Sequence, residues 1–406
     1  MSHILLISRC PPYPLHFGDR LIIYHLAREL SRRGHTIDLL AFAQRPEDHH
    51  QQAHYADYFA HITLIDEPRR PSHAYLKRVV LPSTRFPKNA GQSWSPQMWR
   101  AIEDRRAAHD YDVAHLFGGV QVYEFYHALG ALPAIIVPYE SFSLYLRRLI
   151  EAKHKGGGQG RARYVPTNIV DSLRYLVARH FERWMFEPYQ RTIVVADPDR
   201  AELHTLNPAL AVEVIPNGID LMFFQATDDA RDSCTLLFTG NYEYAPNEDA
   251  ALFLAGDMLP RIREQIPDAK LLLVGNAPTP AMQALQNDHI SVTGRVPDVR
   301  PYLARATIFV SPLRLGAGIK NKTLEALAMG CPVVATPLSV DGIAVRDGYD
   351  SRIADEEAMA DAVVQLLRDT ALQRQFSANG RALIETHYTW SSVADRYEAV
   401  YAQVTN

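Results

Sequence analysis

The sequence predicts an α/β protein made of two doubly wound domains, and three observations carry this prediction. The chain has 406 residues, which suits two domains of about 200 residues each. Short apolar runs alternate with helical apolar patterns in both halves, as in parallel sheets covered by helices. Strong turn formers, Pro216, Asn217 and Gly218, lie between the halves. We therefore expect domains of residues 1–215 and 216–387.

The first half opens with a strand, a helix and a parallel strand. Residues 3–8 form an apolar run, and residues 23–30 carry apolar side chains at helical spacing. Gly34 ends that helix, and TIDLLAF (36–42) predicts the next strand. Further apolar runs predict buried parallel strands at 112–117, 134–138 and 192–196.

The second half repeats this alternation. CTLLFTG (234–240) predicts its first strand, and apolar residues between 250 and 262 predict the helix that follows. A short helix is expected at 321–329, where Gly330 ends it. Other strands are expected at 270–275, 290–294, 307–313 and 332–336.

The loop RLGAGIK (314–320) lies between a predicted strand and the helix at 321–329. Ligands of open α/β sheets bind at this end of the strands, and the N–H groups and dipole of a helix N-terminus attract anions. Gly316 and Gly318 let the backbone approach a phosphate closely. Arg314, Lys320 and Lys322 add more charge than one phosphate needs, so the loop predicts a diphosphate site.

Glu325 is an acid one turn into this helix, and spacing alone leaves two roles open. It could pair with Lys322 at i, i+3 or favour the positive end of the helix. Alternatively, its carboxylate could accept hydrogen bonds from two neighbouring ribose hydroxyls. A nucleoside diphosphate would explain both the acid and the basic loop.

The composition restricts the other partners. The formal net charge is −4 with both signs well mixed, so we expect no nucleic acid. Cys10, Cys234 and Cys331 have no metal-ligand spacing, and we expect no disulfide, metal or cofactor. The histidines at 49, 50 and 54 are interpreted as solvated.

We expect a cytoplasmic protein, because the N-terminus does not resemble a signal peptide and no apolar run is long enough to span a bilayer. The basic, glycine-rich stretch KHKGGGQGRAR (153–163) could be a solvated loop. It could also contact an anionic acceptor or the inner face of a membrane as a peripheral surface.

Four ordered stretches resemble one family: EVIPNGID, LLLVG, VTGRVPDVRPYLARATIFVSPL and GAGIKNKTLEALAMGCPVVATP. They are similar to the retaining glycosyltransferases of family 4, which have the GT-B fold, and to the branch used in polysaccharide biosynthesis. The similarity is strongest from about 212 to 345. It implies two Rossmann-like domains facing a central cleft, with the final helix, about 388–406, crossing back onto the N-terminal domain.

The resemblance also implies roles for individual residues. Glu325 matches a motif glutamate that binds the ribose, and Gly18 matches an N-terminal loop glycine that faces the phosphates. Gly294, Arg295 and Val296 match the segment that lines the nucleobase. The remaining donor-binding residues are the loop positions Arg314, Gly316, Ala317, Gly318 and Ile319.

Two positions depart from the family pattern. Ala317 stands where a first motif glutamate usually touches the transferred sugar, and Asn241 and Asn247 stand where a basic pair is expected. Our hypothesis is that Lys320 and Lys322, with Arg314, replace the lost pair and stabilise the leaving diphosphate. No metal is then required.

The acceptor side is less well defined. His16, His115 and Glu140 lie near predicted strand ends or loops and are candidates for structural, acceptor-positioning or base roles. Asp197 and Asp199 resemble a metal-binding aspartate pair, but Asp197 as an N-cap before Pro198 is the interpretation we favour.

The sequence therefore predicts a retaining, metal-independent glycosyltransferase. It would move a sugar from a nucleoside diphosphate sugar to a glycan or lipid-linked acceptor in surface or extracellular polysaccharide biosynthesis. A nucleotide-sugar epimerase on the same scaffold, or a catalytically silent protein that binds nucleotide sugars, remains an alternative. A dinucleotide dehydrogenase is disfavoured, because the first βα turn has only Gly18 where several spaced glycines are needed.

Overall fold

The computed structural model describes residues 1–155, 169–226 and 231–405. Contacts divide the chain into two units. The first comprises Met1–Leu144, Leu173–Gly218 and Trp390–Asn406, and the second comprises Tyr145–Ser172 and Ile219–Thr389. The sequence-based division assigned residues 145–155 and 169–172 to the first domain, whereas the contacts place them with the second unit.

The first unit contains a seven-stranded parallel sheet in the order β3-β2-β1-β4-β5-β6-β7. The order reverses between β1 and β4, which makes their carboxyl ends a ligand-binding position in open α/β sheets. The strands are β1 (His3–Ser8), β2 (Thr36–Ala43), β3 (His61–Asp66), β4 (Val113–Phe117), β5 (Ala134–Tyr139), β6 (Arg191–Val194) and β7 (Val212–Val214).

Helices cover both faces of this sheet and bury two apolar clusters. Helix α1 begins at Gly18 and ends before Gly34, whose φ of 88° fits a residue without Cβ. The helices are α1 (Gly18–Arg32), α2 (Ser72–Val80), α3 (Pro96–Ala108), α4 (Phe142–Lys155), α5 (Ile169–Glu182), α6 (Asp197–Leu206) and α14 (Trp390–Thr405), with α4 and α5 running across the contact-based boundary.

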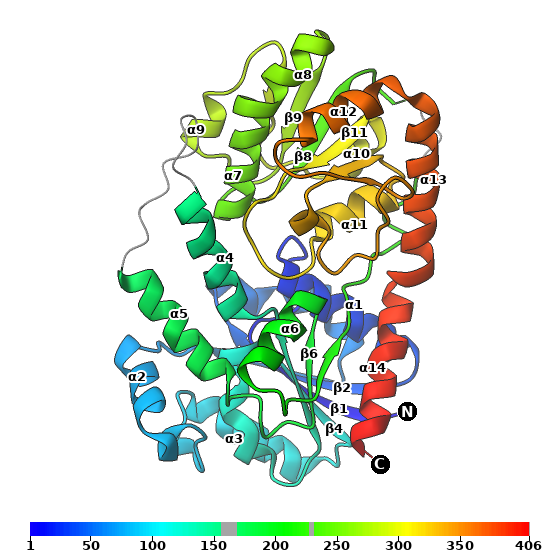
Figure 1. Ribbon diagram of the computed structural model, residues 1–406. Coiled ribbons are helices and arrows are strands. Elements are labelled where there is room, and N and C mark those ends of the chain that lie inside the picture. The colour runs from blue at the N-terminus through cyan, green and yellow to red at the C-terminus, as the bar shows by residue number, and fades with distance from the viewer. Residues whose placement is uncertain (156–168, 227–230, 406) are drawn as a thin grey trace. The chain divides into compact units, whose positions relative to one another are not determined.

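The C-terminal helix α14 packs beside α1 on one face of the first sheet (Figure 1). Tyr397 and Tyr401 bury their rings there. Ion pairs fix its outer side: Arg33 Nη1 lies 2.6 Å from Asp395 Oδ1, and His35 Nε2 lies 2.8 Å from Glu398 Oε1. The last helix therefore belongs to the first unit.

The second unit contains a six-stranded parallel sheet in the order β10-β9-β8-β11-β12-β13. Its order reverses between β8 and β11. The strands are β8 (Thr235–Thr239), β9 (Lys270–Val274), β10 (Ile290–Val292), β11 (Ile308–Ser311), β12 (Val333–Ala335) and β13 (Arg352–Ile353).

The second unit's helices include one irregular run. The helix predicted through 250–262 is α7 (Ala245–Phe253), a π-helical turn at Leu254–Met258 and α8 (Leu259–Gln265). The others are α9 (Pro280–Gln283), α10 (Arg300–Arg305), α11 (Asn321–Ala328), α12 (Met359–Arg368) and α13 (Thr370–His387). Among the described residues, no helix is both long and apolar enough to cross a membrane.

Candidate functional site

Glycines shape the carboxyl edge of the second sheet. Gly275 follows β9 with a φ of 152°, and a Cβ there would lie 1.8 Å from the Gly240 carbonyl oxygen. Only glycine permits this approach between the ends of β8 and β9. The N–H of Gly275 donates to the Gly294 carbonyl at 3.2 Å, so the end of β10 joins the same edge.

The loop between β11 and α11 continues this edge, as the sequence predicts. Gly316 and Gly318 have φ angles of 124° and 65°, in the region that favours glycine. Lys320 precedes the first residue of α11 and makes no side-chain cap to its N–H groups. Ala317, between the two glycines, and Ile319, directly after them, are buried. The first turn of α11 thus offers donors and a positive dipole end.

Arg314 is committed to a structural ion pair. Its guanidinium donates to both carboxylate oxygens of Asp249, at 2.9 and 2.5 Å, and lies 4.5 Å from the centre of the Phe253 ring. The Arg314 side chain is 10% exposed and that of Asp249 is 4% exposed. A cation that is already neutralised by a buried carboxylate adds little attraction for diphosphate. The expected contact of Arg314 with a diphosphate stays a prediction, which would require the ion pair with Asp249 to share its charge.

The ammonium of Lys320 is also engaged within its own loop. It donates to the carbonyl oxygens of Ala317 and Gly318. Lys320 is 9% exposed. In this arrangement Lys320 holds the glycine loop in shape, and its expected contact with the leaving diphosphate stays a prediction.

Lys322 has a different environment. Its ammonium donates to the amide oxygen of Asn247 and lies 4.5 Å from the centre of the Phe238 ring. Burial lowers the pKa of Lys322 to about 7, with Lys320 adding to the effect against the attraction of Glu325. The ammonium therefore lies next to Asn247, one of the two positions where the basic pair is missing, and its partner there is a neutral amide.

Glu325 lies one turn after Lys322 on α11 and is half-buried. Burial raises the pKa of Glu325 to about 7, and Lys322 opposes that rise. An acid and a base are thus held close together in an environment that disfavours both charges. A ligand with an anionic group and a pair of hydroxyls would stabilise the two charged forms.

The predicted nucleobase segment follows β10 at the same edge. Gly294 has a φ of 70°, and a Cβ at this position would meet open space. Arg295 is exposed and Val296 is half-buried. The segment therefore presents an open backbone turn flanked by one basic and one apolar side chain.

In the first unit, three of the predicted residues lie at the carboxyl edge of the sheet. Gly18 is the first residue of α1, and exposed His16 precedes it with its ring 4.3 Å from that of Phe17. Glu140 follows β5 directly after Tyr139, whose φ is 79°. These positions suit acceptor contacts on the first unit.

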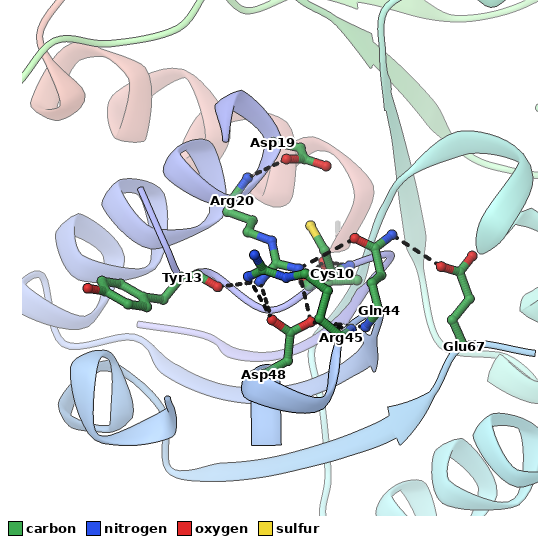
Figure 2. Close-up of polar contacts among 9 residues, drawn as sticks. Cys10, Tyr13, Asp19, Arg20, Gln44, Arg45, Asp48 and Glu67 are labelled. Atoms are coloured by element: carbon green, nitrogen blue, oxygen red, sulfur yellow. Dashed lines mark hydrogen bonds and ion pairs between the residues drawn. The ribbon is translucent and has the colours of Figure 1, made fainter. Parts of the chain in front are cut away.

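A buried ion pair anchors the loop that leads to Gly18 (Figure 2). Arg20 donates to Asp48 Oδ1 at 2.7 Å and to Oδ2 at 2.9 Å, and it also donates to the Tyr13 carbonyl. Asp48 accepts further hydrogen bonds from the N–H groups of Gln44 and Arg45. The 9–18 loop is therefore tied to the end of β2.

His115 lies in the middle of β4 and packs beneath α14. Its Nδ1 is 2.8 Å from the Tyr401 hydroxyl, and its ring stacks on Tyr397. The residue is 2% exposed, and burial lowers its pKa to about 3. A neutral core histidine cannot contact an acceptor, so His115 leaves the acceptor-side candidates.

The aspartate pair after β6 serves the fold. Ala196, not Asp197, is the N-cap of α6, so Asp197 and Pro198 occupy its first turn. Asp199 is fully buried and accepts a hydrogen bond from the Ser141 N–H at 2.9 Å. Asp197 pairs with Arg200 in the same helix at 2.5 Å.

Sequence reasoning missed three partners of the glycine loop. Asn247 and Asp249 in α7 receive the two basic side chains, and Arg148 donates to the Gly316 carbonyl at 3.0 Å. All three are more than 60 residues away from the residues they contact. Two signals were available: Asn247 departs from the family pattern, and Asp249 is an acid in the partly apolar helix 245–253. The basic stretch 153–163 lies outside the side chains that the structure describes.

Two solved structures share this architecture. Sucrose-phosphate synthase from Thermosynechococcus elongatus has a TM-score of 0.71 at 18% identity, with 99% of this chain and 98% of that chain covered. HepE from Anabaena, solved with UDP, has a TM-score of 0.65 at 13% identity, covering 99% of this chain and 100% of that chain. These likenesses establish the two-domain α/β GT-B fold.

Curated relatives come from Mycobacterium tuberculosis. A phosphatidyl-myo-inositol mannosyltransferase is 29% identical over 254 residues, which span 59% of this chain and 66% of the relative. A GDP-mannose-dependent alpha-(1-6)-phosphatidylinositol monomannoside mannosyltransferase is 24% identical, covering 79% of this chain and 96% of the relative.

Family descriptions match both halves. Residues 233–369 match "Glycosyl transferases group 1", and residues 21–223, half of the chain, match "Glycosyltransferase Family 4". The chain belongs to glycosyltransferase family 4.

Proposed function

We propose that this protein is a retaining glycosyltransferase whose donor is a nucleoside diphosphate sugar. The observation that carries the proposal is the first turn of α11, where Lys322 faces the neutral amide of Asn247 and Glu325 follows on the same helix. The diphosphate would receive the Lys322 charge and the N–H groups of the glycine loop. Glu325 would accept hydrogen bonds from the ribose hydroxyls.

The same contacts would assist bond cleavage. In a retaining transfer, the bond from the anomeric carbon to the diphosphate oxygen breaks, and the acceptor oxygen bonds to the same face of that carbon. The acceptor proton passes to the departing diphosphate. Negative charge grows on the diphosphate as the bond breaks. The Lys322 ammonium and the N–H groups of the glycine loop, which are already in place, therefore stabilise the transition state more than the ground state. This route uses no side-chain nucleophile and no metal.

The relatives' printed functions suggest the first substrates to examine. Two are mannosyltransferases, one described as GDP-mannose-dependent and both as acting on phosphatidylinositol lipids, whereas HepE was solved with UDP. We infer a lipid-linked or glycan acceptor, used at a membrane face in the synthesis of surface polysaccharide. His16 and Glu140 are the acceptor-side residues that this inference retains.

A thermal-shift and calorimetric panel of UDP, GDP, ADP and dTDP with their common sugar conjugates tests the donor. One nucleotide diphosphate should stabilise the wild type selectively, and Glu325→Gln should lose most of that stabilisation. Glu264→Gln, an exposed acid on α8 in the same unit, is the matched control and should respond as the wild type. If no conjugate binds, the donor proposal is wrong.

A catalytically silent nucleotide-sugar-binding protein is the second candidate, and buried Ala317 favours it. That position lacks the acid that the family pattern places near the transferred sugar. Mass spectrometry of the donor, with and without mannosyl, glucosyl and lipid acceptors, separates the two. Transfer or slow donor hydrolysis supports the enzyme, whereas tight binding of an unchanged donor supports the silent protein.

A further inference from the structure

The amino edge of the first sheet gathers histidines around one aspartate, at the opposite end of the strands from the residues discussed above. His3 is the first residue of β1, His61 is the first residue of β3, and Asp38 is the third residue of β2. These strands are neighbours, and Asp38 pairs directly with His61 in the register. His109 follows α3 and leads into β4, the other neighbour of β1.

Three of these side chains have the spacing of metal ligands. One ligand atom each from Asp38, His61 and His109 lies within 4.8 Å of the others, and this is the one such group of histidine, cysteine or acidic side chains in the described part of the chain. Asp38 Oδ1 lies 3.0 Å from His61 Nδ1. Ligands of a tetrahedral zinc ion are separated by about 3.3 Å, given zinc–ligand bonds of about 2.0 Å.

His3 provides a second, independent observation. Its Nδ1 lies 3.0 Å from the Asp110 carbonyl oxygen, so this nitrogen carries the proton. Its Nε2 then presents a lone pair; this atom is buried without a hydrogen-bond partner and lies 3.7 Å from Asp38 Oδ1. A proton on His3 or a metal cation between the two atoms would satisfy both of them. Carbonyl-bound Nδ1–H is also how metal-binding histidines are commonly oriented.

The surroundings of Asp38 leave one oxygen for a cation. The Tyr111 hydroxyl donates to Oδ2 at 2.5 Å, and Arg105 Nη1 lies 3.7 Å from the same oxygen. These contacts orient the carboxylate through Oδ2, whereas Oδ1 forms a hydrogen bond with His61 Nδ1 that a bound cation would replace. Arg105 cancels much of the carboxylate charge, so binding must come from neutral nitrogen donors. That donor set disfavours Ca²⁺ and Mg²⁺ and favours Zn²⁺.

We propose that Asp38, His61 and His109, with His3 beside them, form a zinc-binding site that fastens the edge strand β3 to the sheet. Asp38 is buried, whereas the His61 side chain is 45% exposed, so the ion can reach the site from solvent. The ligands come from β2, β3 and the segment after α3. Zinc would therefore bind the folded unit and stabilise it.

The test uses the full chain after chelator treatment and removal of the chelator. Calorimetry with Zn²⁺ near neutral pH should show one tight site, and the Tm should rise with the logarithm of free zinc. With Co²⁺ as a probe, a visible d–d absorption band should report nitrogen and oxygen ligands without a thiolate charge-transfer band. His61→Gln and His109→Gln should each weaken zinc binding by about tenfold or more.

His49→Gln is the matched control. His49 Nε2 lies 2.8 Å from Asp66 Oδ1, so it also forms a histidine–carboxylate pair, but it is outside the three-ligand group. This variant should bind zinc as the wild type does. Circular dichroism and the zinc-free Tm establish that each variant is folded, and Tyr111→Phe provides a variant that keeps every ligand and should weaken binding modestly.

Two results would overturn the proposal. One is a wild type that binds no stoichiometric zinc. The other is a folded His109→Gln protein that binds Zn²⁺ as tightly as the wild type, which would assign the ion to other histidines or to a cysteine. Neither result bears on nucleotide binding, because the proposed donor contacts belong to the second unit.

Discussion

Two basic side chains lie in the first turn of a helix, one in each unit, and their partners differ. Arg20 is the third residue of α1 and Lys322 is the second residue of α11, each in a helix that follows a strand and a loop. Arg20 is 2% exposed and bound to both oxygens of the Asp48 carboxylate. Lys322 donates to the neutral amide of Asn247.

The difference separates a structural cation from one that can receive a ligand. Hydrogen bonds and charge from Arg20 help to lower the pKa of Asp48 to about 2, against the effect of burial, so this pair is charged and satisfied in the folded protein. Lys322 has no comparable compensation, and burial lowers its pKa to about 7. An arriving anion can improve the environment of Lys322 but not that of Arg20.

The largest expected effect comes from breaking the Arg20–Asp48 pair. Asp48→Ala leaves a buried guanidinium without its carboxylate, and we expect a loss of about 3–5 kcal/mol in the free energy of unfolding. Urea denaturation of the variant measures it. Asp66→Ala, which removes an exposed acid, is the control. A loss below about 1 kcal/mol would mean that the pair does not anchor the 9–18 loop.

The next effect is the acid sensitivity of the same pair. Because the folded-state pKa of Asp48 falls from 3.8 to about 2, its contribution is complete above the unfolded value and disappears as the pH falls through about 2. This lowering of the Asp48 pKa corresponds to about 2 kcal/mol in the free energy of unfolding.

The measurement is the difference in unfolding free energy between the wild type and Asp48→Asn at several pH values. The other carboxylates are the same in both proteins, so their contributions cancel in this difference. It should shrink by about 2 kcal/mol between about pH 5 and about pH 2. A difference that stays constant would show that the Asp48 pKa is not lowered.

Much of the fold could be predicted because buried strands produce apolar runs. The prediction of a strand at residues 3–8 is confirmed by β1, and the run at 270–275 by β9. The missed strand β3 is at the edge of the sheet, and its residues His61–Asp66 are mostly half-buried, so no apolar run marks it. Strand β13 has two residues, too few for any pattern.

The candidate site was predictable in position but not in its contacts. Gly316 and Gly318 indicated the loop in the sequence, because backbone positions with positive φ angles favour glycine. The sequence could not separate Arg314 from Lys322, because the partner of each is decided by side chains of α7 that the fold brings near. The spacing of residues along the sequence describes a single helix or loop. Whether a charged side chain is neutralised depends also on the side chains of a second element that packs against it.

The third prediction concerns Lys322 itself. Lys322→Met keeps a side chain of similar length and removes the charge, and we expect it to weaken binding of the nucleoside diphosphate by about 10- to 100-fold, the value of a hydrogen bond to a charged group. Lys270→Met, an exposed lysine at the start of β9, should bind as the wild type. Calorimetry with the nucleotide selected by the panel provides the affinities.

A charge swap sharpens this result. Adding Asn247→Lys to Lys322→Asn returns a cation to the position where the family pattern has one and restores the contact with an amide. The double variant should recover most of the affinity that Lys322→Asn loses. If the double variant binds no better than Lys322→Asn, the charge of Lys322 does not substitute for the missing basic pair.

The smallest effect is the pH dependence of binding. Since the pKa of Lys322 is about 7 in the empty site, the side chain must take up a proton to bind diphosphate above that pH. Lys322→Arg stays charged throughout, and it shares the titration of the ligand and of Glu325 with the wild type. The wild-type affinity divided by that of Lys322→Arg should therefore fall from about pH 7 to about pH 9, approaching about tenfold per pH unit. Parallel affinity curves for the two proteins would mean that Lys322 is already protonated before the ligand binds. Burial beside the neutral amide of Asn247 would then not lower the pKa of Lys322 to about 7.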